Sequence, residues 1–316
     1  MRLPALAGEP AIRALNGEEP RGQGKTSSLM SAQKQVNAAR HKMSPVGKPK
    51  LGQNFLVDAN AARRIVDALG DSRQSNVVEI GPGRGALTHL LAERARHLFA
   101  IEFDSMLAQR LRVAFASAKN VEIVEADFLK VPLEELLLSR GGQDQRAKVV
   151  GNIPYYITSD IVLRLFGQYT WIETIVLMVQ KEVADRLAAE PGTRDYGLLT
   201  VTANLFADVE QLFTLPPGAF SPPPKVYSSV LRFRISPKIA ELGVDAREFL
   251  NFCKLAFAHK RKTLFNNLRT RYGGKEIREA IQEAAADPNA RAEALSLSEL
   301  AKIHYALGTA PIGNHR

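Results

Sequence analysis

Short apolar runs alternate with amphipathic stretches between residues 59 and 190, and this alternation limits the possible folds more than any other feature. Strands are predicted at 77–80, 97–103, 121–127, 148–152 and 174–180, and helices at 59–70, 86–95, 105–117, 158–166 and 181–190. Alternation of strands and helices is typical of a sheet whose strands run parallel and are joined through helices. The sequence therefore predicts an α/β fold with a doubly wound, mostly parallel sheet.

The remaining segments divide the chain further. Residues 1–44 have no sustained periodicity and are rich in Ala, Gly, Pro, Arg and Gln, which predicts a disordered tail. Apolar runs at 209–215 and 228–235 flank a proline-rich loop, as expected of a hairpin that ends the sheet. After Pro237 only helical periodicity remains, near 245–258, 261–270, 275–285 and 298–306. The predicted domains are a tail (1–44), an α/β domain (45–237) and a small all-helical domain (238–316).

The positive charge is concentrated at the two ends of the chain. Residues 1–50 carry nine Lys or Arg against three Asp or Glu, and residues 238–316 carry thirteen against nine, whereas the middle is nearly neutral. Basic flanks around a neutral body suggest that the flanks bind a polyanion, for which nucleic acid is the usual candidate. The alternative is that surface lysines only keep the protein soluble.

Composition excludes several classes of protein. No apolar run approaches the roughly 20 residues of a membrane span, and residues 1–42 lack the apolar segment of a secretory signal. The single cysteine, Cys253, excludes an intrachain disulfide and a multi-cysteine metal site, and we interpret it as a small core residue. We expect a cytoplasmic protein without a metal ion or a membrane partner.

A glycine-rich loop, Gly81-Pro82-Gly83-Arg84-Gly85, joins the strand at 77–80 to the next helix. Glycines let the backbone turn tightly and approach a ligand, and the helix start offers unpaired N–H groups. The G-x-G-x-G spacing differs from the G-x-G-x-x-G that binds a dinucleotide pyrophosphate. It resembles the first motif of S-adenosylmethionine-dependent methyltransferases, and this resemblance predicts S-adenosylmethionine as the cofactor.

Acidic residues end the next two predicted strands. Glu102 follows Gly81 by 21 residues, at the position where an acid accepts hydrogen bonds from ribose hydroxyls. Asp127 ends the third strand, where its carboxylate is suited to accept from an adenine amino group while the ring of Phe128 lies on the base. The alternative for each acid is an exposed residue at a strand end.

The stretch GNIPYY at 151–156 falls where the strand at 148–152 ends. Asn supplies a donor and an acceptor, Pro stiffens the backbone, and Tyr offers a flat face with a polar tip. The tetrapeptide NIPY resembles the (Asn/Asp/Ser)-x-Pro-(Tyr/Phe) motif of enzymes that methylate exocyclic amino groups of bases. We interpret Asn152 and the carbonyl near Pro154 as acceptors for an adenine N6 group, and Tyr155 as a stacking face for the extruded base. The alternative is a strand-ending turn with a core tyrosine.

Taken together, eight ordered motifs resemble the ribosomal RNA adenine N6,N6-dimethyltransferase family over residues 48–305. They are KLGQNFL, EIGPGRGALT, Glu102, EADFLKV, NIPYYITS, VQKEVADRL, FSPPPKVYSSV and the pair CKLAF and RKTLFNNL. The resemblance is greatest to the small-subunit branch, which dimethylates two adjacent adenosines in the 3′-terminal hairpin of 16S rRNA. It implies a Rossmann-like methyltransferase domain, a helical RNA-binding C-terminal domain, and the immature 30S subunit as partner of a monomeric enzyme.

The resemblance also implies roles for individual residues. Asn54 and the backbone of Leu56 would close over the cofactor, and Gly81, with Gly83 beside it, would lie under the methionine part. Asn152 would sit between the cofactor and the target, and Phe220 would cover the second face of the adenine, although a core phenylalanine is the alternative. The RNA contacts are expected from Lys260, Arg261 and Lys262.

The sequence departs from the family pattern at two places. Ile153 replaces the usual Leu, a change that keeps the apolar volume, and His259-Lys260-Arg261-Lys262 replaces an Arg-Arg-Lys run in a C-terminal helix. Two other functions stay open at this point. One is methylation of a single adenosine of 23S rRNA, as in the antibiotic-resistance relatives, and the other is a non-catalytic RNA-binding assembly factor.

Overall fold

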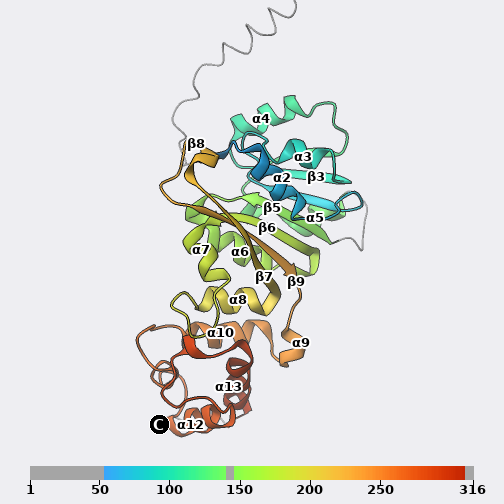
Figure 1. Ribbon diagram of the computed structural model, residues 1–316. Coiled ribbons are helices and arrows are strands. Elements are labelled where there is room, and N and C mark those ends of the chain that lie inside the picture. The colour runs from blue at the N-terminus through green and yellow to red at the C-terminus, as the bar shows by residue number, and fades with distance from the viewer. Residues whose placement is uncertain (1–52, 140–145, 310–316) are drawn as a thin grey trace, which may run out of the picture. The chain divides into compact units, whose positions relative to one another are not determined.

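The computed structural model describes residues 53–139 and 146–309. The larger of its two sheets has seven strands and can be followed in Figure 1. The strand order is β4-β3-β2-β5-β6-β9-β7. The first five of these strands are parallel, and β9 runs antiparallel to both β6 and β7. The prediction of a mostly parallel sheet that ends in an antiparallel strand pair is therefore confirmed. The strands are β2 (Asn76–Ile80), β3 (His97–Glu102), β4 (Val121–Glu125), β5 (Ala147–Asn152), β6 (Ile172–Gln180), β7 (Ala207–Leu215) and β9 (Ser228–Ile235).

Helices connect the strands, as the alternation predicts. They are α2 (Ala59–Asp67), α3 (Thr88–Ala92), α4 (Ser105–Ala114), α5 (Leu133–Leu138), α6 (Thr158–Phe166), α7 (Lys181–Leu187) and α8 (Leu198–Phe206). Short 3-10 turns lie at η1 (Phe128–Lys130), η2 (Tyr155–Ile157), η3 (Tyr169–Trp171) and η4 (Pro217–Ala219). Two of these helices, α5 and α8, are not among the predicted elements.

The sheet is buried on both faces because successive strand residues point to opposite sides. On β2, Val77 belongs to one apolar cluster with α2 and α3, and Val78 belongs to the other cluster with α5, α6 and α8. Strands of a parallel sheet covered on both faces are buried along their length, which explains why all five residues of β2 are buried. The doubly wound class is confirmed.

A second sheet of two short strands, β1 (Phe55–Leu56) and β8 (Phe220–Ser221), was not predicted. Phe55 pairs with Ser221 and Leu56 with Phe220. The N–H of Val57 also donates to the carbonyl of Ala219 over 2.9 Å. This pairing brings two sequence motifs that are 164 residues apart next to each other.

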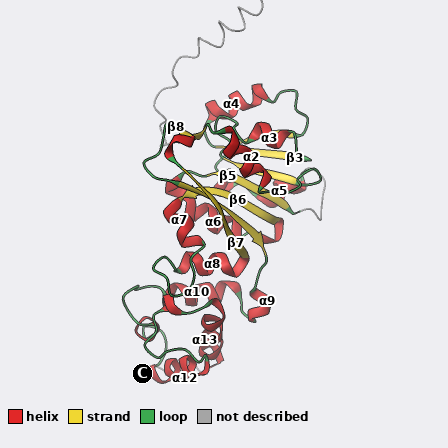
Figure 2. Ribbon diagram, viewed as in Figure 1, coloured by secondary structure: helices red, strands yellow, loops and turns green. Residues whose placement is uncertain are grey.

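Between Ser236 and Thr309, the part of the chain after β9 that the structure describes, the elements are helices and a 3-10 turn (Figure 2). They are α9 (Ile239–Leu242), α10 (Ala246–Ala256), α11 (Leu264–Leu268), α12 (Gly274–Glu283), the turn η5 (Ala292–Ala294) and α13 (Leu297–Thr309). Cys253 is buried in α10, as predicted for a core residue. The domain boundary at 237 stays a prediction, and it coincides with the point where strands give way to helices.

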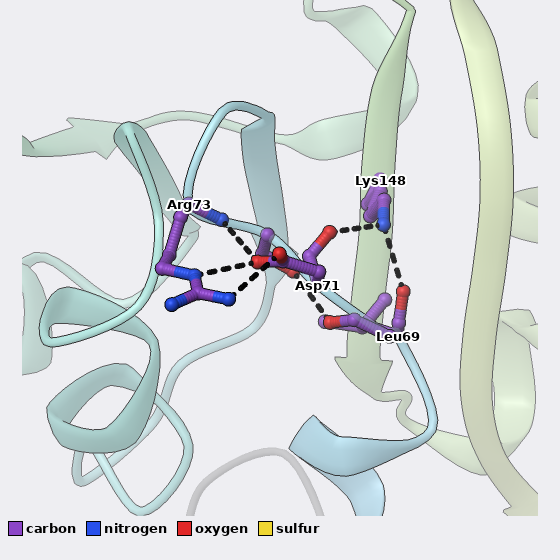
Figure 3. Close-up of polar contacts among 6 residues, drawn as sticks. Leu69, Asp71, Arg73 and Lys148 are labelled. Carbon is purple, nitrogen blue, oxygen red and sulfur yellow. Dashed lines mark hydrogen bonds and ion pairs between the residues drawn. The ribbon is translucent and has the colours of Figure 1, made fainter.

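A buried lysine fastens the amino end of β5 to the end of α2 (Figure 3). Lys148 Nζ donates to the carbonyl of Leu69 over 3.0 Å and to that of Asp71 over 2.6 Å. The Arg73 side chain binds the Asp71 carboxylate and lowers the pKa of Asp71 to about 2. A buried ammonium is costly unless it is hydrogen-bonded, and here two carbonyls meet that need. β5, whose other end carries the start of GNIPYY, is therefore fastened at its amino end.

The predicted tail at residues 1–44 lies outside the described residues. No helix in the described ranges is long and apolar enough to cross a membrane.

Candidate active site

The glycine loop turns directly from β2 toward α3 at the carboxyl edge of the sheet. Gly81, Gly83 and Gly85 have φ values of 64°, 58° and 85°, a region that side chains disfavour. At Gly83 space is also limiting, because a Cβ would lie 3.0 Å from a ring carbon of Phe55. The loop is therefore closely covered by β1, and the Arg84 guanidinium lies 4.3 Å from the centroid of the same ring.

Glu102 ends β3 and faces this loop. Its side chain is buried, and its two oxygens accept 2.9 Å hydrogen bonds from the backbone N–H groups of Gly83 and Asp104. Burial raises the pKa of Glu102, and the two backbone hydrogen bonds oppose that rise. The carboxylate thus lies between the glycine loop and the start of α4, where the sequence predicts a ribose acceptor.

Glu79, on β2, is a second buried acid beside this loop, and no role was predicted for it from the sequence. Burial raises its pKa to about 8, the Thr88 hydroxyl opposes this rise, and the charge of Glu102 adds to it. Its Oε2 atom has no hydrogen-bond partner. The sequence signal was a glutamate inside an otherwise apolar strand, a position where an acid is rarely placed without a reason.

Asp127 lies two residues after the end of β4, at the N-cap of η1. Its carboxylate accepts from the N–H of Leu129 over 3.1 Å, and Lys130 Nζ lies 3.5 Å away. Phe128 is buried in the larger apolar cluster, so its contact with a base stays a prediction. Phe103, directly after Glu102, is 65% exposed. An exposed ring at this position was not predicted from the sequence.

The GNIPYY stretch lies beside the glycine loop because β5 pairs with β2. Ile80 is opposite Gly151, and a Cβ on Gly151 would lie 2.9 Å from the Ile80 carbonyl oxygen, so only glycine fits. A Cβ on Gly81 would in turn lie 3.8 Å from the carbonyl oxygen of Asn152. The two motifs that the sequence predicts for cofactor and target are therefore adjacent.

Three residues of the stretch have defined contacts. Asn152 Nδ2 donates to the carbonyl of Asn54 over 3.0 Å, which ties it to the N-terminal segment. The hydroxyl of Tyr155 lies 2.9 Å from Ser228 Oγ. Pro154 is half-buried at the start of η2, and its carbonyl accepts from the Thr158 hydroxyl over 3.3 Å. Tyr155 is half-buried rather than a core residue.

Leu56 and Phe220 face each other in the β1–β8 pair and are both buried. They belong to the apolar cluster that also contains Ala219 and Val230. The role of Phe220 as a second face for the adenine stays a prediction, because its ring is 3% exposed.

The basic run at 259–262 is in a loop, so the predicted helix at 261–270 is wrong in its first part. α10 ends at Ala256, and α11 begins at Leu264 after the N-cap Thr263. His259, Lys260, Arg261 and Lys262 are all exposed. Lys260 Nζ donates to the carbonyl of Arg194 over 2.6 Å, whereas Lys262 borders a hollow of about 330 Å³ with Asn266, Arg269 and Thr270.

Acceptors, an amide and aromatic rings thus gather at one edge of the sheet. Glu102 and Asp127 supply carboxylates, Asn152 supplies an amide, and Tyr155 and Phe103 supply ring surface. This set suits a ligand with hydroxyl and amino donors and flat rings. Within the described ranges, no group of three His, Cys, Asp or Glu is placed to hold a metal ion.

Known proteins with similar sequences carry related names. The chain is 51% identical over 278 residues to the ribosomal RNA small subunit methyltransferase A of Koribacter versatilis, covering 85% of this chain and 98% of the relative. The protein of the same name from Acidobacterium capsulatum is 55% identical over 257 residues, with 81% and 89% of the two chains covered.

Solved structures agree in fold. The crystal structure of the 23S rRNA methyltransferase ErmE superposes with a TM-score of 0.62 and 28% identity, covering 81% of this chain and all of that one. A dimethyladenosine transferase from Plasmodium falciparum gives a TM-score of 0.66 at 24% identity, with 79% and 95% covered.

The model of the family described as ribosomal RNA adenine dimethylase matches residues 46–307, nearly the whole described part of the chain. With identities above 50% to proteins covered over most of their length, the chain belongs to the ribosomal RNA adenine dimethylase family.

Proposed function

We propose that this protein transfers methyl groups from S-adenosylmethionine to N6 of two adjacent adenosines in the 3′-terminal hairpin of 16S rRNA. Its substrate is the immature 30S subunit, and it acts as a cytoplasmic monomer in small-subunit biogenesis. The observation that carries the proposal is the pairing of β5 with β2, because it holds Asn152 next to Gly81. The names of the relatives from Koribacter and Acidobacterium support the choice of the small subunit over 23S rRNA.

The residues at the carboxyl edge fit S-adenosylmethionine. A loop that has no side chain at Gly81, Gly83 and Gly85 lets a ligand approach its backbone closely. Glu102 is held by two backbone N–H groups, so its remaining lone pairs are oriented to accept from ribose hydroxyls. Asp127 is positioned to accept from the adenine amino group, and Phe103 offers an exposed ring at the same edge. When bound, the cofactor supplies an electrophilic methyl group on a sulfonium.

Asn152 orients the amino group of the target. Its Nδ2 is already committed to the Asn54 carbonyl, so the side-chain Oδ1 is the atom left to accept from the adenine N6. The lone pair of that nitrogen is delocalised into the ring and reacts poorly. In the first transfer, an acceptor pair made of Oδ1 and a backbone carbonyl near Pro154 would hold both N6 protons and favour a more nucleophilic, pyramidal nitrogen. In each transfer the N6–methyl bond would form as the methyl–sulfur bond breaks, and N6 would release one proton. In the second transfer the pair would hold the one proton that remains. Positioning of the two reactants then supplies much of the rate.

Tyr155 holds the extruded base. The hydrogen bond between the Tyr155 hydroxyl and Ser228 Oγ restrains the ring, so a face of the tyrosine ring stays available at the edge of the sheet. Enzymes that modify a base in a folded nucleic acid first remove it from its stack, and an aromatic face repays part of that cost. Phe220 is proposed for the opposite face of the adenine.

Methyl transfer to 30S subunits tests this function. Purified protein, labelled S-adenosylmethionine and under-methylated 30S subunits should give label at two adjacent adenosines near the 3′ end of 16S rRNA, as N6,N6-dimethyladenosine. Label on 50S subunits instead would favour the 23S alternative. Binding to 30S subunits without transfer would favour a non-catalytic assembly factor.

A further inference from the structure

Two exposed tyrosines lie next to the hydrogen bond between Tyr155 and Ser228. Tyr156 is 66% exposed and Tyr227 is 54% exposed, and each follows or precedes one of the bonded residues in the chain. Among residues 53–139 and 146–309, neither ring stacks on another aromatic ring or lies beneath a guanidinium. Val226, which precedes Tyr227, is also 42% exposed, so several large apolar side chains are exposed close to the candidate site, and grouped apolar side chains mark interaction sites whereas isolated ones do not.

Sheet pairing places both tyrosine segments at one edge. Met178 of β6 is opposite Asn152 on one side and opposite Val230 of β9 on the other. Two residues further along β6, Gln180 is opposite Ser228, and the N–H of Lys181 donates to the carbonyl of Tyr227 over 2.9 Å. The backbone at Tyr227 is therefore at the carboxyl end of β6, next to the end of β5 that carries Asn152.

The surroundings of the tyrosines favour a nucleic acid as the occupant. Lys181 and Lys225 are both exposed and flank Tyr227, the first through its backbone hydrogen bond and the second along the chain. Lys181 also pairs with Asp185 at 2.7 Å. Aromatic rings beside cations suit a stacked base with its phosphate, since every base has a flat face and every phosphate a negative charge.

We infer that Tyr156 and Tyr227 form a stacking surface for the nucleotide next to the target adenosine, an inference that rests on the proposed function. Moving one adenosine into the site removes a stacking partner from its neighbour. Rings at the edge of the site replace that partner, and they stabilise the extruded state without touching the reacting nitrogen. For a substrate with two adjacent target adenosines, this neighbour is the other target. Tyr156 and Tyr227 are accordingly positioning residues.

Binding and single-turnover methylation of under-methylated 30S subunits test this inference. The variants are Tyr156→Ala, Tyr227→Ala, their double substitution, and Tyr156→Phe with Tyr227→Phe. Loss of a stacking face should weaken 30S binding by roughly 5- to 150-fold in each Ala variant. The Phe variants keep the face and should stay within about threefold of the wild type. Affinity for S-adenosylmethionine, measured by calorimetry, should not change, because neither ring is assigned to that part of the site.

Val113→Ala is the control for loss of an exposed apolar side chain. Val113 is 75% exposed near the end of α4 and is assigned to no part of the site, so its replacement should leave 30S binding unchanged. Ala variants that bind 30S subunits as well as the wild type would overturn the inference, as would Phe variants as weak as Ala. A change from dimer to monomer in the Ala variants, seen by sedimentation, would assign the tyrosines to a contact between copies instead. A wild-type enzyme that transfers no methyl to 30S subunits would reject the proposed function itself, independently of the variants.

Discussion

The backbone N–H of Gly83 donates a 2.9 Å hydrogen bond to the carboxylate of Glu102, so the loop after β2 is fastened to the end of β3. The other carboxylate oxygen accepts from the N–H of Asp104, the N-cap residue of α4. One side chain thus fixes two backbone segments and keeps lone pairs for a ligand.

Glu102→Ala should weaken S-adenosylmethionine binding for two reasons. The ribose hydroxyls lose a charged acceptor, worth about 1.5–3 kcal/mol, and the Gly83 N–H loses its partner. Calorimetry measures the affinity, and NAD serves as the control ligand, for which no binding is expected because the loop lacks the pyrophosphate spacing. Unchanged affinity in the variant would remove Glu102 from the site.

Asn152→Ala should reduce the rate of methyl transfer far more than it weakens RNA binding. Only interactions that strengthen in the transition state raise the chemical rate, and a polar group of this kind typically contributes about 100-fold. Single-turnover rates on under-methylated 30S subunits measure the first effect and filter binding measures the second. The variant also loses the contact with Asn54, so S-adenosylmethionine affinity is measured alongside. A variant with the wild-type rate would contradict the assigned role.

Tyr155→Phe should retain most of the activity, whereas Tyr155→Ala should not. The Phe variant keeps the stacking face and loses only the contact with Ser228, and Ser228→Ala removes the same contact from the other side. The Ala variant loses a face worth about 1–3 kcal/mol. Equal rates for Tyr155→Phe and Ser228→Ala, both near the wild type, are expected. If Tyr155→Phe were as inactive as Tyr155→Ala, the hydroxyl and not the ring would be essential.

The basic loop at 259–262 should contribute to RNA binding in a salt-dependent way. Replacing Arg261 and Lys262 with Ala should flatten the plot of log affinity against log salt by roughly 0.7–0.9 per lost phosphate contact. Lys260→Ala is tested separately, because its ammonium binds the Arg194 carbonyl and its loss should also lower thermal stability. Affinity for S-adenosylmethionine is the control. An unaltered slope in the Arg261 and Lys262 variant would indicate a loop that only faces solvent.

The free energy of unfolding of the protein without ligand should fall as the pH rises, because of Glu79. Its pKa is raised from 4.5 to about 8 by burial, so the folded state binds this proton more tightly than the unfolded state does. The resulting stabilisation, on the order of a few kcal/mol, is fully present below about pH 4.5 and is lost as the pH rises to about 8. Glu79→Gln, which mimics the protonated acid, should flatten the dependence of stability on pH between these values. Urea unfolding at pH 5, 7 and 8.5 measures this, and equal slopes in the two proteins would show that Glu79 does not titrate in this range.

The parallel sheet was predictable because its strands are mostly apolar and are separated by amphipathic helices. The polar residues Glu102, Asp127 and Asn152 were visible for the same reason, since each lies at the end of a predicted strand. α8 was not visible. Most of its residues are buried, including Thr200, Val201 and Phe206, so it has no polar face and no helical period.

Features that depend on distant segments could not be predicted from local pattern. The β1–β8 pair joins Leu56 to Phe220 and Phe55 to Ser221, which are 164 and 166 positions apart. Each strand has only two residues, too few to show an alternating pattern in the sequence. The same pair buries Phe220, and nothing in the sequence next to Phe220 predicts that burial. The helix predicted from periodicity near 261–270 includes Arg261 and Lys262, but the Thr263 hydroxyl accepts a hydrogen bond from the N–H of Asn266 and caps α11, which therefore begins after the basic run.

Gly151 contacts no proposed ligand, yet it sets the separation between the two halves of the site. A Cβ at this position would lie only 2.9 Å from the Ile80 carbonyl oxygen, so any other residue would push β5 away from β2. Asn152 would move with its strand, and Gly81 would stay with the other. Methyl transfer requires the cofactor's methyl group and the target nitrogen to meet in line. The distance between them thus depends on the absence of a Cβ at Gly151, a residue inside the sheet that contacts neither substrate.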